Sequence, residues 1–528
     1  MKHIKYWLAA SLPAVMALTA CIEIKQTSVL DLKPNGLKVV NEVDPRYQSY
    51  NIEMVEVVGG KFWRPYSTMN EVKGDKAKKS QDDYGIDVSS GNESLYRKLD
   101  PVNLAEPKLM KLAQGLAPAY VRTSGTWANA VYFQNDGQPA RPAPKGFVNV
   151  LTVPQWKDLL DFVKATDSKL VTSFAVCDGV RDKSGVWTPV EAQKLIDFST
   201  ANGVKIAGAE LFNEPTMPMA GGEISNTKYN VKNYAKDIAA YTAWNKAKAP
   251  YMLQAGPGTV GEGVPGFVDM FMKMNPVLTE DAMKTVAKGS FDVFSYHFYG
   301  AGSERVCKEP PFATRIDSAL THRWISLTDT TFSFFNKIHD QYMPGSPIWI
   351  TETAEAAGGG DRWANTYLDT FRYLYQLGSL AQKGVDVIFH NTLAASEYSL
   401  IDQDTHNPNP NYWAAYLWNK FMGTKSYGTT INQNGVYVFA HNTKSKESSL
   451  TFLVINPTEE ARQITMPASA KIYAVSANGT TSRAVNLNGK PLELSAENQL
   501  PAVEGVSPKD TPVRDKAIKT ERAALYPQ

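Results

Sequence analysis

The chain has 528 residues, of which 43% are hydrophobic and 20% are charged. Its 55 lysines and arginines nearly balance its 53 aspartates and glutamates, which leaves a formal net charge of +2. This balance argues against a nucleic-acid partner and against strong attraction to a polyanion. The length is sufficient for one large core domain and a smaller one.

The N-terminus has the pattern of an export signal. After two lysines, an apolar stretch runs from Tyr6 to Leu18 and reaches Leu18-Thr19-Ala20-Cys21; it is too short to span a membrane. Small residues before a cysteine resemble a bacterial lipoprotein signal over residues 1–21, which implies cleavage before Cys21, acylation of its thiol and a lipid anchor. The alternative is a plain signal peptide with an incidental cysteine. The residue after Cys21 is Ile22 and not the aspartate that would act as a retention signal. We therefore expect an exported lipoprotein of the cell envelope, at the outer membrane, on its periplasmic or surface face.

Two further cysteines, Cys177 and Cys307, follow Cys21. An oxidising compartment would permit them to pair if the fold brought them together. The sequence leaves this pairing open.

Residues 47–423 alternate between short apolar runs and amphipathic stretches of helical period. The expected strands are Tyr50–Val58, Ala119–Arg122, Leu170–Ala175, Ile206–Phe212, Tyr251–Ala255, Asp292–Tyr296, Ile348–Thr351 and Val385–His390. The expected helices are Asn103–Gln114, Val153–Ala165, Pro189–Asn202, Tyr229–Lys246, Leu327–Asp340, Trp363–Lys383 and Tyr412–Met422. Eight strands in alternation with helices predict an α/β fold, a (β/α)8 TIM barrel.

Beyond Gly423 the apolar runs become short and are separated by turn signals such as Asn478-Gly479 and Asn488-Gly489. This pattern predicts an antiparallel β-sandwich domain over residues 424–510. Residues 22–46 also look strand-like and are too few to stand alone, so we expect them to pack on this sandwich. Residues 511–528 are polar, and we expect a tail with partial disorder.

Two glutamates carry the strongest functional signal. One lies in Ala209-Glu210-Leu211-Phe212-Asn213-Glu214-Pro215 and the other in Trp349-Ile350-Thr351-Glu352-Thr353. Each follows an apolar run, as a residue does when a barrel strand delivers it to a cleft, and the C-terminal ends of barrel strands surround a single cleft. A glycosidase that retains anomeric configuration needs two carboxyl groups about 5 Å apart. We therefore expect Glu214 to be the acid/base, with a pKa raised by the charge of Glu352, and Glu352 to be the nucleophile.

Other polar residues near these glutamates suit the same chemistry. The amide of Asn213 can bind the 2-hydroxyl of the sugar. In Ser295-Tyr296-His297-Phe298-Tyr299, a phenol could hold Glu352 ionised, and we favour Tyr299 over His297. For each residue the alternative is a structural group with satisfied hydrogen bonds.

The combination of motifs resembles glycoside hydrolase family 79, the heparanase and β-glucuronidase family, within the clan of retaining (β/α)8 glycosidases. The matching segments are Gly115-Leu116-Ala117-Pro118-Ala119-Tyr120-Val121-Arg122 followed by Gly125-Thr126, the two glutamate segments, Gly358-Gly359-Gly360, Glu397-Tyr398-Ser399-Leu400-Ile401-Asp402 and Pro410-Asn411-Tyr412-Trp413. The resemblance implies a sandwich built from both chain ends, a retaining mechanism without metal or other cofactor, and a uronic acid in the subsite next to the cut.

The resemblance also implies roles for single residues. Thr126 is similar to a sugar-contacting residue after the second strand, and Glu53 to an acidic residue that binds sugar hydroxyls. Tyr398 matches a tyrosine that helps to bind the uronate carboxylate. His390, at the end of the last strand, aligns less well as a sugar contact.

The chain also departs from the family pattern. The glycine-rich turn expected before Tyr398 reads Ala394-Ala395-Ser396-Glu397, and a second carboxylate-binding tyrosine is replaced by Ala357. A lost phenol removes a hydrogen bond of roughly 1.5–3 kcal/mol, and Glu397 would repel an anion unless it points away. A small residue at position 357 would make room for a modified sugar such as 4-O-methylglucuronate.

The favoured interpretation is a retaining, exo-acting β-glucuronidase that releases glucuronic acid or 4-O-methylglucuronic acid from a glycan or oligosaccharide. One alternative is a β-glycosidase of the same clan that acts on a neutral sugar, or internally on a glycosaminoglycan. Another is a non-catalytic, glycan-binding surface lipoprotein. The sequence does not indicate the oligomeric state.

Overall fold

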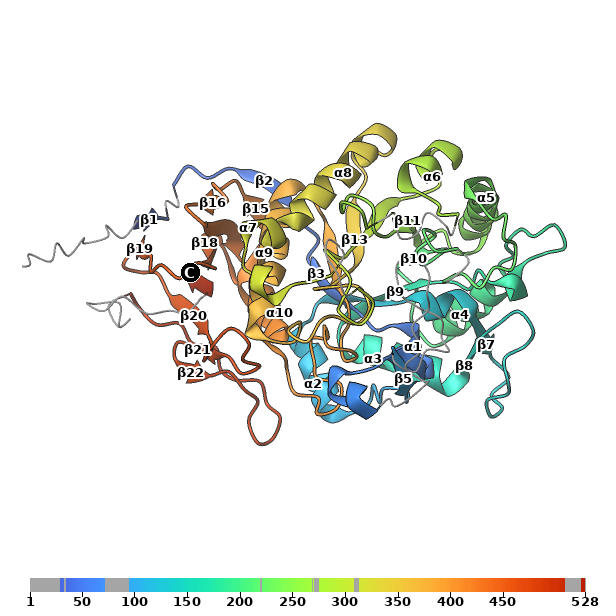
Figure 1. The fold of residues 1–528 in the computed structure, drawn as a ribbon, viewed down its shortest axis with the longest axis horizontal. Helices are drawn as coiled ribbons and strands as arrows, with labels where there is room; N and C mark the ends of the chain where they lie inside the picture. The colour runs from blue at the N-terminus through green and yellow to red at the C-terminus, as the bar shows by residue number, and fades with distance from the viewer. Residues whose placement is uncertain are drawn as a thin grey trace, which may run out of the picture.

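The computed structural model describes residues 29–32, 35–71, 95–218, 221–267, 269, 275–307, 313–508 and 524–527. Cys21 and the expected export signal lie outside these residues. Two parts lie side by side along the longest axis (Figure 1). One is a barrel surrounded by helices, and the other is built from strands of both ends of the chain. None of the helices in the described residues combines the length and apolar character needed to cross a membrane.

Eight parallel strands close into a barrel in chain order, which confirms the predicted fold class. They are β3 (Gln48–Asn51), β6 (Ala119–Thr123), β9 (Ser168–Ser173), β10 (Gly208–Glu210), β11 (Leu253–Thr259), β12 (Val293–Phe298), β13 (Ile348–Thr353) and β14 (Val387–His390). The helices that follow them are α2 (Pro107–Gly115), α3 (Val153–Ala165), α4 (Val190–Ala201), α5 (Val231–Lys248), α6 (Thr279–Thr285), α7 (His322–Ile325), α8 (Leu327–Tyr342), α9 (Tyr367–Lys383) and α10 (Pro410–Phe421).

The first strand differs from its prediction. The apolar run Tyr50–Val58 is expected to be one strand, but β3 ends at Asn51 and residues Met54–Val58 form the short helix α1. A short apolar run fits a buried strand and a buried helix equally well. The chain leaves the barrel after Asn51, and α1 buries Met54 and Val55 over its rim.

The barrel interior is layered. Apolar side chains form a compact cluster at its lower level: Tyr120, Val171, Ala255, Val293, Trp349, Val387 and Phe389. Two residues further along the strands, the inward positions become polar, and they include Arg122, Glu210, Ser295 and Thr351. This polar layer lies at the C-terminal ends of the strands, where barrel enzymes place their active sites.

Smaller elements build the rim above this layer. The antiparallel pair β4 (Gly60–Trp63) and β5 (Tyr96–Leu99), the parallel pair β7 (Val131–Gln134) and β8 (Asn149–Thr152), and the 3₁₀ segments η1 (Tyr66–Glu71), η3 (Thr126–Ala130), η4 (Asp178–Val180) and η6 (Ile316–Ser318) all lie in loops between barrel strands.

The second part is a two-layered β domain to which the N-terminal segment contributes. Its larger sheet has the order β2-β15-β17-β18-β23-β20-β21-β22, and β16 pairs with β17. The strands are β2 (Val39–Glu42), β15 (Met422–Tyr427), β16 (Asn432–Gln433), β17 (Val436–Thr443), β18 (Lys446–Ile455), β20 (Ile472–Ser476), β21 (Asn486–Leu487), β22 (Lys490–Pro491) and β23 (Ala524–Pro527). The smaller sheet joins β1 (Val29–Asp31) in parallel to β19 (Gln463–Thr465).

The C-terminal end is not simply a polar tail. Strand β23 lies in residues 511–528 and pairs with both β18 and β20. These pairs give hydrogen-bond partners to two strands that would otherwise face each other across a gap in the sheet.

Cys177 and Cys307 are both buried and free, so the pairing that the sequence leaves open is not formed. Burial raises the pKa of each thiol to about 11. Both thiols are therefore protonated at neutral pH and poorly reactive.

Candidate active site

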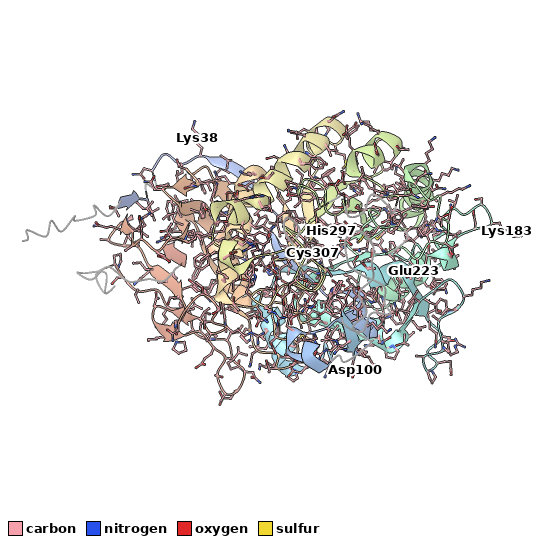
Figure 2. All side chains as sticks on the ribbon, in the orientation of Figure 1. Lys38, Asp100, Lys183, Glu223, His297 and Cys307 are labelled. Carbon is pink, nitrogen blue, oxygen red and sulfur yellow. The ribbon has the colours of Figure 1, made fainter. Side chains whose placement is uncertain are left out.

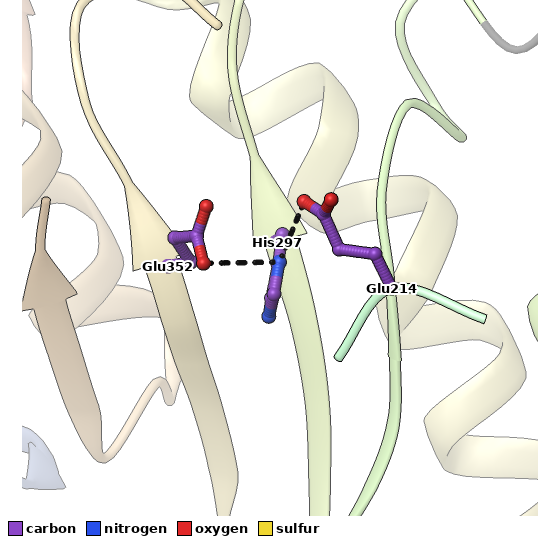
Figure 3. A group of neighbouring side chains, drawn as sticks. All are labelled: Glu214, His297 and Glu352. Atoms are coloured by element: carbon purple, nitrogen blue, oxygen red, sulfur yellow. Dashed lines mark hydrogen bonds and ion pairs between the residues drawn. The ribbon is translucent and has the colours of Figure 1, made fainter. Parts of the chain in front are cut away.

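The structure brings Glu214 and Glu352 to the same side of the polar layer, with His297 between them (Figure 3). One carboxylate oxygen of each glutamate and one ring nitrogen of His297 all lie within 4.8 Å of one another. Glu352 lies on β13 and His297 on the neighbouring strand β12. Figure 2 shows His297 well inside the molecule, whereas Lys38, Asp100 and Lys183 lie at its edges.

Glu214 reaches the site from a loop and not from a strand end. The expected fourth strand runs to Phe212, but β10 ends at Glu210, and Glu214 follows four residues later with a φ of 55°. Asn129 fixes this loop, because its side chain accepts from the backbone N–H of Asn213 (3.1 Å) and donates to the backbone carbonyl of Asn213 (2.9 Å). Glu210 takes the strand-end position that the pattern assigns to Glu214.

Arg122 connects both glutamate segments from below. Its guanidinium is fully buried and donates to Glu210 Oε2 (2.8 Å), to Glu352 Oε2 (3.1 Å) and to Asn213 Oδ1 (2.8 Å). Glu210 also accepts from the hydroxyls of Ser295 and Thr351, each at 2.7 Å. This network holds Glu352 in one orientation, since its Oε2 is bonded to a group with no freedom to move.

His297 lies between the two candidate catalytic groups. Its Nδ1 is 3.0 Å from Glu214 Oε1 and 3.7 Å from Glu352 Oε2. Burial lowers the pKa of His297, but Glu352, together with hydrogen bonds to Glu210 and Glu214, raises it to about 9. The raised pKa favours the charged form of the ring, which can donate from Nδ1 to Glu214.

Tyr299 contacts Glu352 directly, whereas the nearest ring nitrogen of His297 lies 3.7 Å from it. The Tyr299 hydroxyl donates to Glu352 Oε1 at 2.6 Å. The Nδ2 of Asn391 lies 3.1 Å from the Tyr299 oxygen, 3.1 Å from the Tyr398 oxygen and 2.8 Å from Glu53 Oε1. Asn391 thus joins three of the predicted site residues into one group.

Glu53 stands at the start of α1, and its Oε2 is buried without a hydrogen-bond partner. Burial, followed by the charge of Glu352, raises the pKa of Glu53 well above its usual range. A protonated Glu53 can donate to a ligand and does not repel an anion.

The amide of Asn213 is oriented by its neighbours. Its Oδ1 accepts from Arg122 and from the Ser124 hydroxyl (3.2 Å), which turns Nδ2 away from both donors. Thr126 begins η3, beside the Glu214 loop, and is partly exposed.

His390 does not join the group. Along β14, Val387 and Phe389 belong to the barrel interior, so the alternation of the strand directs His390 outward. Its ring packs against Tyr373 of α9, with ring centres 4.9 Å apart, and its Nε2 is 2.8 Å from the backbone carbonyl of Tyr398. Burial lowers the pKa of His390 to about 3, so a neutral His390 supports the Tyr398 segment from behind.

The pKa values of the carboxyl groups in the site are shifted in different directions. Burial, and after it the charge of Glu352, raises the pKa of Glu214, although His297 opposes this shift. Burial would also raise the pKa of Glu210, but Arg122 and His297 hold it below its usual range. Glu210 therefore stays charged next to Arg122, below the candidate catalytic pair, whereas the surroundings of Glu214 favour the protonated form that a general acid needs.

Glu214, His297 and Glu352 are also the group whose donor atoms could surround a metal ion among the described residues. The charges do not favour a cation there, because His297 is protonated at neutral pH and Glu352 is already paired with Arg122. A hydrogen-bonded acid pair accounts for the same three residues.

The departures from the family pattern have a structural explanation in part. Glu397 is turned away from the candidate catalytic pair and forms an ion pair with the buried Arg305. Ala357 lies in the loop after β13, where its backbone exchanges hydrogen bonds with the segment after β12, at Ala301 and Ser303. The structure gives no reason why position 357 is an alanine.

Sequence reasoning missed three residues of the network: Arg122, Glu210 and Asn391. Arg122 and Glu210 each stand at a polar inward position of an otherwise apolar strand, which is an unusual place for a charge. A charged residue at an inward position of an apolar strand is a signal that could have identified both residues. Asn391 follows the last barrel strand and carries no comparable signal.

Comparison with known proteins agrees with this geometry. The sequence profile described as glycosyl hydrolase family 79, N-terminal domain, matches residues 91–378, more than half of the chain. Heparanase-like protein 1 of Arabidopsis thaliana is 26% identical over 383 residues, covering 69% of this chain and 67% of that protein. Baicalin-beta-D-glucuronidase of Scutellaria baicalensis is 25% identical over 438 residues, covering 74% of this chain and 77% of that protein.

Among solved structures, a 4-O-alpha-L-rhamnosyl-beta-D-glucuronidase from Fusarium oxysporum aligns with a TM-score of 0.54 at 11% identity, over 95% of this chain and 100% of that one. At this identity the likeness concerns the fold alone. The profile match over most of the barrel is the decisive result. The chain belongs to glycoside hydrolase family 79, and it is a glycosidase.

Proposed function

We propose that this glycosidase is a retaining, exo-acting β-glucuronidase that releases glucuronic acid or 4-O-methylglucuronic acid from glycan ends. The observation that carries the retaining mechanism is the approach of the Glu214 and Glu352 carboxylates to within 4.8 Å. Retaining enzymes hold their two carboxyl groups about 5–5.5 Å apart, whereas inverting enzymes hold them farther apart to leave room for a water molecule between the general base and the sugar.

In the first step the Glu352 carboxylate attacks the anomeric carbon while Glu214 gives its proton to the departing glycosidic oxygen. The bond from the anomeric carbon to that oxygen breaks, and a glycosyl ester to Glu352 forms. Esterification removes the charge that raises the pKa of Glu214. In the second step Glu214 takes a proton from water, whose oxygen displaces Glu352 and restores the original configuration.

Two features support a terminal uronic acid. Glu53, Tyr299, Asn391 and Tyr398 are each at least nine-tenths buried and surround the face beside Glu352, as the closed end of a cleft for a terminal sugar would. Their phenol and amide groups can donate to a carboxylate, and the raised pKa of Glu53 removes a charge that would oppose it. The small side chain of Ala357 is compatible with a 4-O-methyl group.

A neutral sugar is the second candidate, and a specific observation favours it. Two arginines contact the described residues of this region. Arg122 already forms an ion pair with Glu352, and Arg305 forms one with Glu397. Neither of these two arginines is then left to bind the uronate carboxylate, which would rely on the phenol and amide groups beside Glu352. A panel of aryl β-glucuronides, 4-O-methylglucuronides, glucosides and galactosides separates the two candidates. A preference for a neutral glycoside would contradict the proposed substrate.

The roles of the two glutamates are tested with Glu352→Gly and Glu214→Ala. We expect each to reduce turnover of an unactivated substrate by at least about a hundredfold, which is the usual minimum for acid/base catalysis. Azide can replace the missing group in both. We expect an α-glycosyl azide from Glu352→Gly and a β-glycosyl azide from Glu214→Ala. The reverse assignment, or a wild-type product of inverted configuration, would contradict the mechanism.

A further inference from the structure

The buried ion pair between Arg305 and Glu397 lies outside the catalytic network described above. The side chain of Arg305 is 0% exposed and that of Glu397 is 12% exposed. A pair removed from water to this extent is costly unless other hydrogen bonds complete it. The contacts of both residues show what these bonds connect.

Arg305 binds two separate segments besides that of Glu397. Its Nη1 donates to the backbone carbonyls of Gly358 (2.9 Å) and Gly360 (2.6 Å), in the loop after β13. Its Nε donates to the carbonyl of Arg64, next to η1 (2.8 Å). The guanidinium carbon also lies 3.9 Å from the centre of the Tyr66 ring. Arg305 itself belongs to the segment after β12.

Glu397 completes the connection from the segment after β14. Its Oε1 accepts from the backbone N–H of Tyr66 (2.8 Å), and its own N–H donates to the carbonyl of Gly359 (3.1 Å). The ion pair therefore ties together the three rim segments after β12, β13 and β14, and it adds the start of η1.

The residue next to Glu397 is Tyr398, whose hydroxyl is bonded to Asn391 beside Glu53 and Tyr299. Tyr398 is packed against the same glycine loop. A Cβ placed on Gly360 would lie 2.9 Å from both the Cβ and the backbone nitrogen of Tyr398. The position of the Tyr398 phenol is thus set by the loop that Arg305 and Glu397 hold.

We propose that Arg305 and Glu397 are positioning residues, which fix the Tyr398 phenol for sugar binding by holding the three rim segments in register. The inference rests on the proposed function, because Tyr398 matters only if a sugar occupies the face beside Glu352. It differs from a purely structural role, since it predicts weaker substrate binding whenever the pair is absent, even in a variant of normal stability.

Two variants separate these roles. Glu397→Gln keeps an acceptor for the Tyr66 N–H but removes the charge, so an unpaired buried arginine remains. The double variant Arg305→Met/Glu397→Met removes both charges and all the connecting hydrogen bonds, and apolar replacement of a buried pair is often neutral in stability. Glu304→Gln is the matched control, because Glu304 pairs with Arg362 on the surface beside this site, with side chains 43% and 56% exposed.

The measurements are Tm, and kcat and KM on the aryl glycoside that the wild type cleaves best. We expect KM to rise about tenfold in Glu397→Gln and in the double variant, with kcat within about threefold, as for lost uniform binding. The control should keep the wild-type KM. A lowered Tm with unchanged KM in Glu397→Gln, or an unchanged KM in a stable double variant, would overturn the proposal. The panel of aryl glycosides, measured with the wild type, tests the proposed substrate separately. The ratio of the variant KM to the wild-type KM can be measured on whichever glycoside the wild type prefers.

Discussion

At the scale of single residues, the proposed role of Glu214 as the acid/base depends on its protonation state. Glu214 is useful as an acid only while it is protonated. Burial and the charge of Glu352 raise the pKa of Glu214, whereas His297 and Arg122 lower it. The net direction is upward, so the protonated form persists to a higher pH than an ordinary glutamate would allow. The first step is then lost as the pH rises through this raised pKa.

We expect Glu352→Gln to lower the pKa of Glu214, because the substitution removes the largest contribution after burial. The measurement is a ¹³C NMR titration of protein labelled at the glutamate carboxyl carbons, with the Glu214 signal assigned by its loss in Glu214→Gln/Glu352→Gln. The control is Glu262→Gln, a buried glutamate bonded to Thr279. An unchanged pKa of Glu214 in Glu352→Gln would show that the two carboxyl groups do not communicate.

The predicted site residues and the missed ones differ in how they reach the site. Glu352, Tyr299 and Tyr398 stand in recognisable segments, and the structure brings them together with Glu53 and Asn213. Arg122, Glu210 and Asn391 depend on which side of the barrel wall a position faces. The same dependence explains His390. Its side chain points outward because of the alternation along β14, and a shift of one residue, which the sequence alone does not exclude, would turn it inward.

At the scale of elements, the turn between β6 and η3 shows how backbone and site are coupled. Gly125 has a φ of 83° and a ψ of 171°, a conformation that favours glycine. A Cβ at this position would lie 2.5 Å from Glu53 Oε2. The glycine therefore provides both the turn and the space for the Glu53 carboxyl.

We expect Gly125→Ala to lower kcat/KM by at least about tenfold, equivalent to about 1.4 kcal/mol, because Glu53 must shift. The backbone strain should also cost on the order of 1–3 kcal/mol in stability. Gly137→Ala is the control: Gly137 has a φ of 70°, with nothing within 4 Å of an added Cβ. It should lose stability but keep its kcat/KM. Equal kcat/KM in the two variants would remove the proposed role of this space.

Most elements could be predicted because the alternation of strands and helices is regular. Seven of the eight barrel strands are found with ends that move by a few residues. The run Tyr50–Val58 fails because it contains a strand end, a turn and a helix start without a glycine or proline to separate them. Strand β23 could not be expected from its polar surroundings, because its pairing depends on β18 and β20, which lie far earlier in the chain.

At the scale of the whole molecule, helix α9 joins the barrel to the β domain. Every residue from Tyr367 to Ala381 in this helix is buried. One apolar cluster continues from the barrel helices to Tyr437, Phe439 and Leu453 of the larger sheet. The two parts therefore share a core, and we expect them to unfold together.

The outer layer of the β domain depends on the N-terminal segment. Leu30 and Leu32 pack on Val436, Val438 and Val454, on the sheet face opposite α9. We expect Leu32→Ala to lower the free energy of unfolding by about 2–5 kcal/mol through the cavity that it creates. The catalytic parameters should stay unchanged at low temperature, since none of the described site residues contacts this cluster.

The test follows urea unfolding by circular dichroism and by loss of glycosidase activity in parallel. In Leu32→Ala both transitions should move to lower urea by the same amount, because barrel and β domain share one core. Val40→Ala in β2 is the control, since Val40 is 51% exposed and its truncation should cost little. If activity in Leu32→Ala persisted at urea concentrations where part of the circular dichroism signal had already been lost in a separate, earlier transition, the barrel would unfold independently of the β domain. The shared core would then not couple the stability of the two parts.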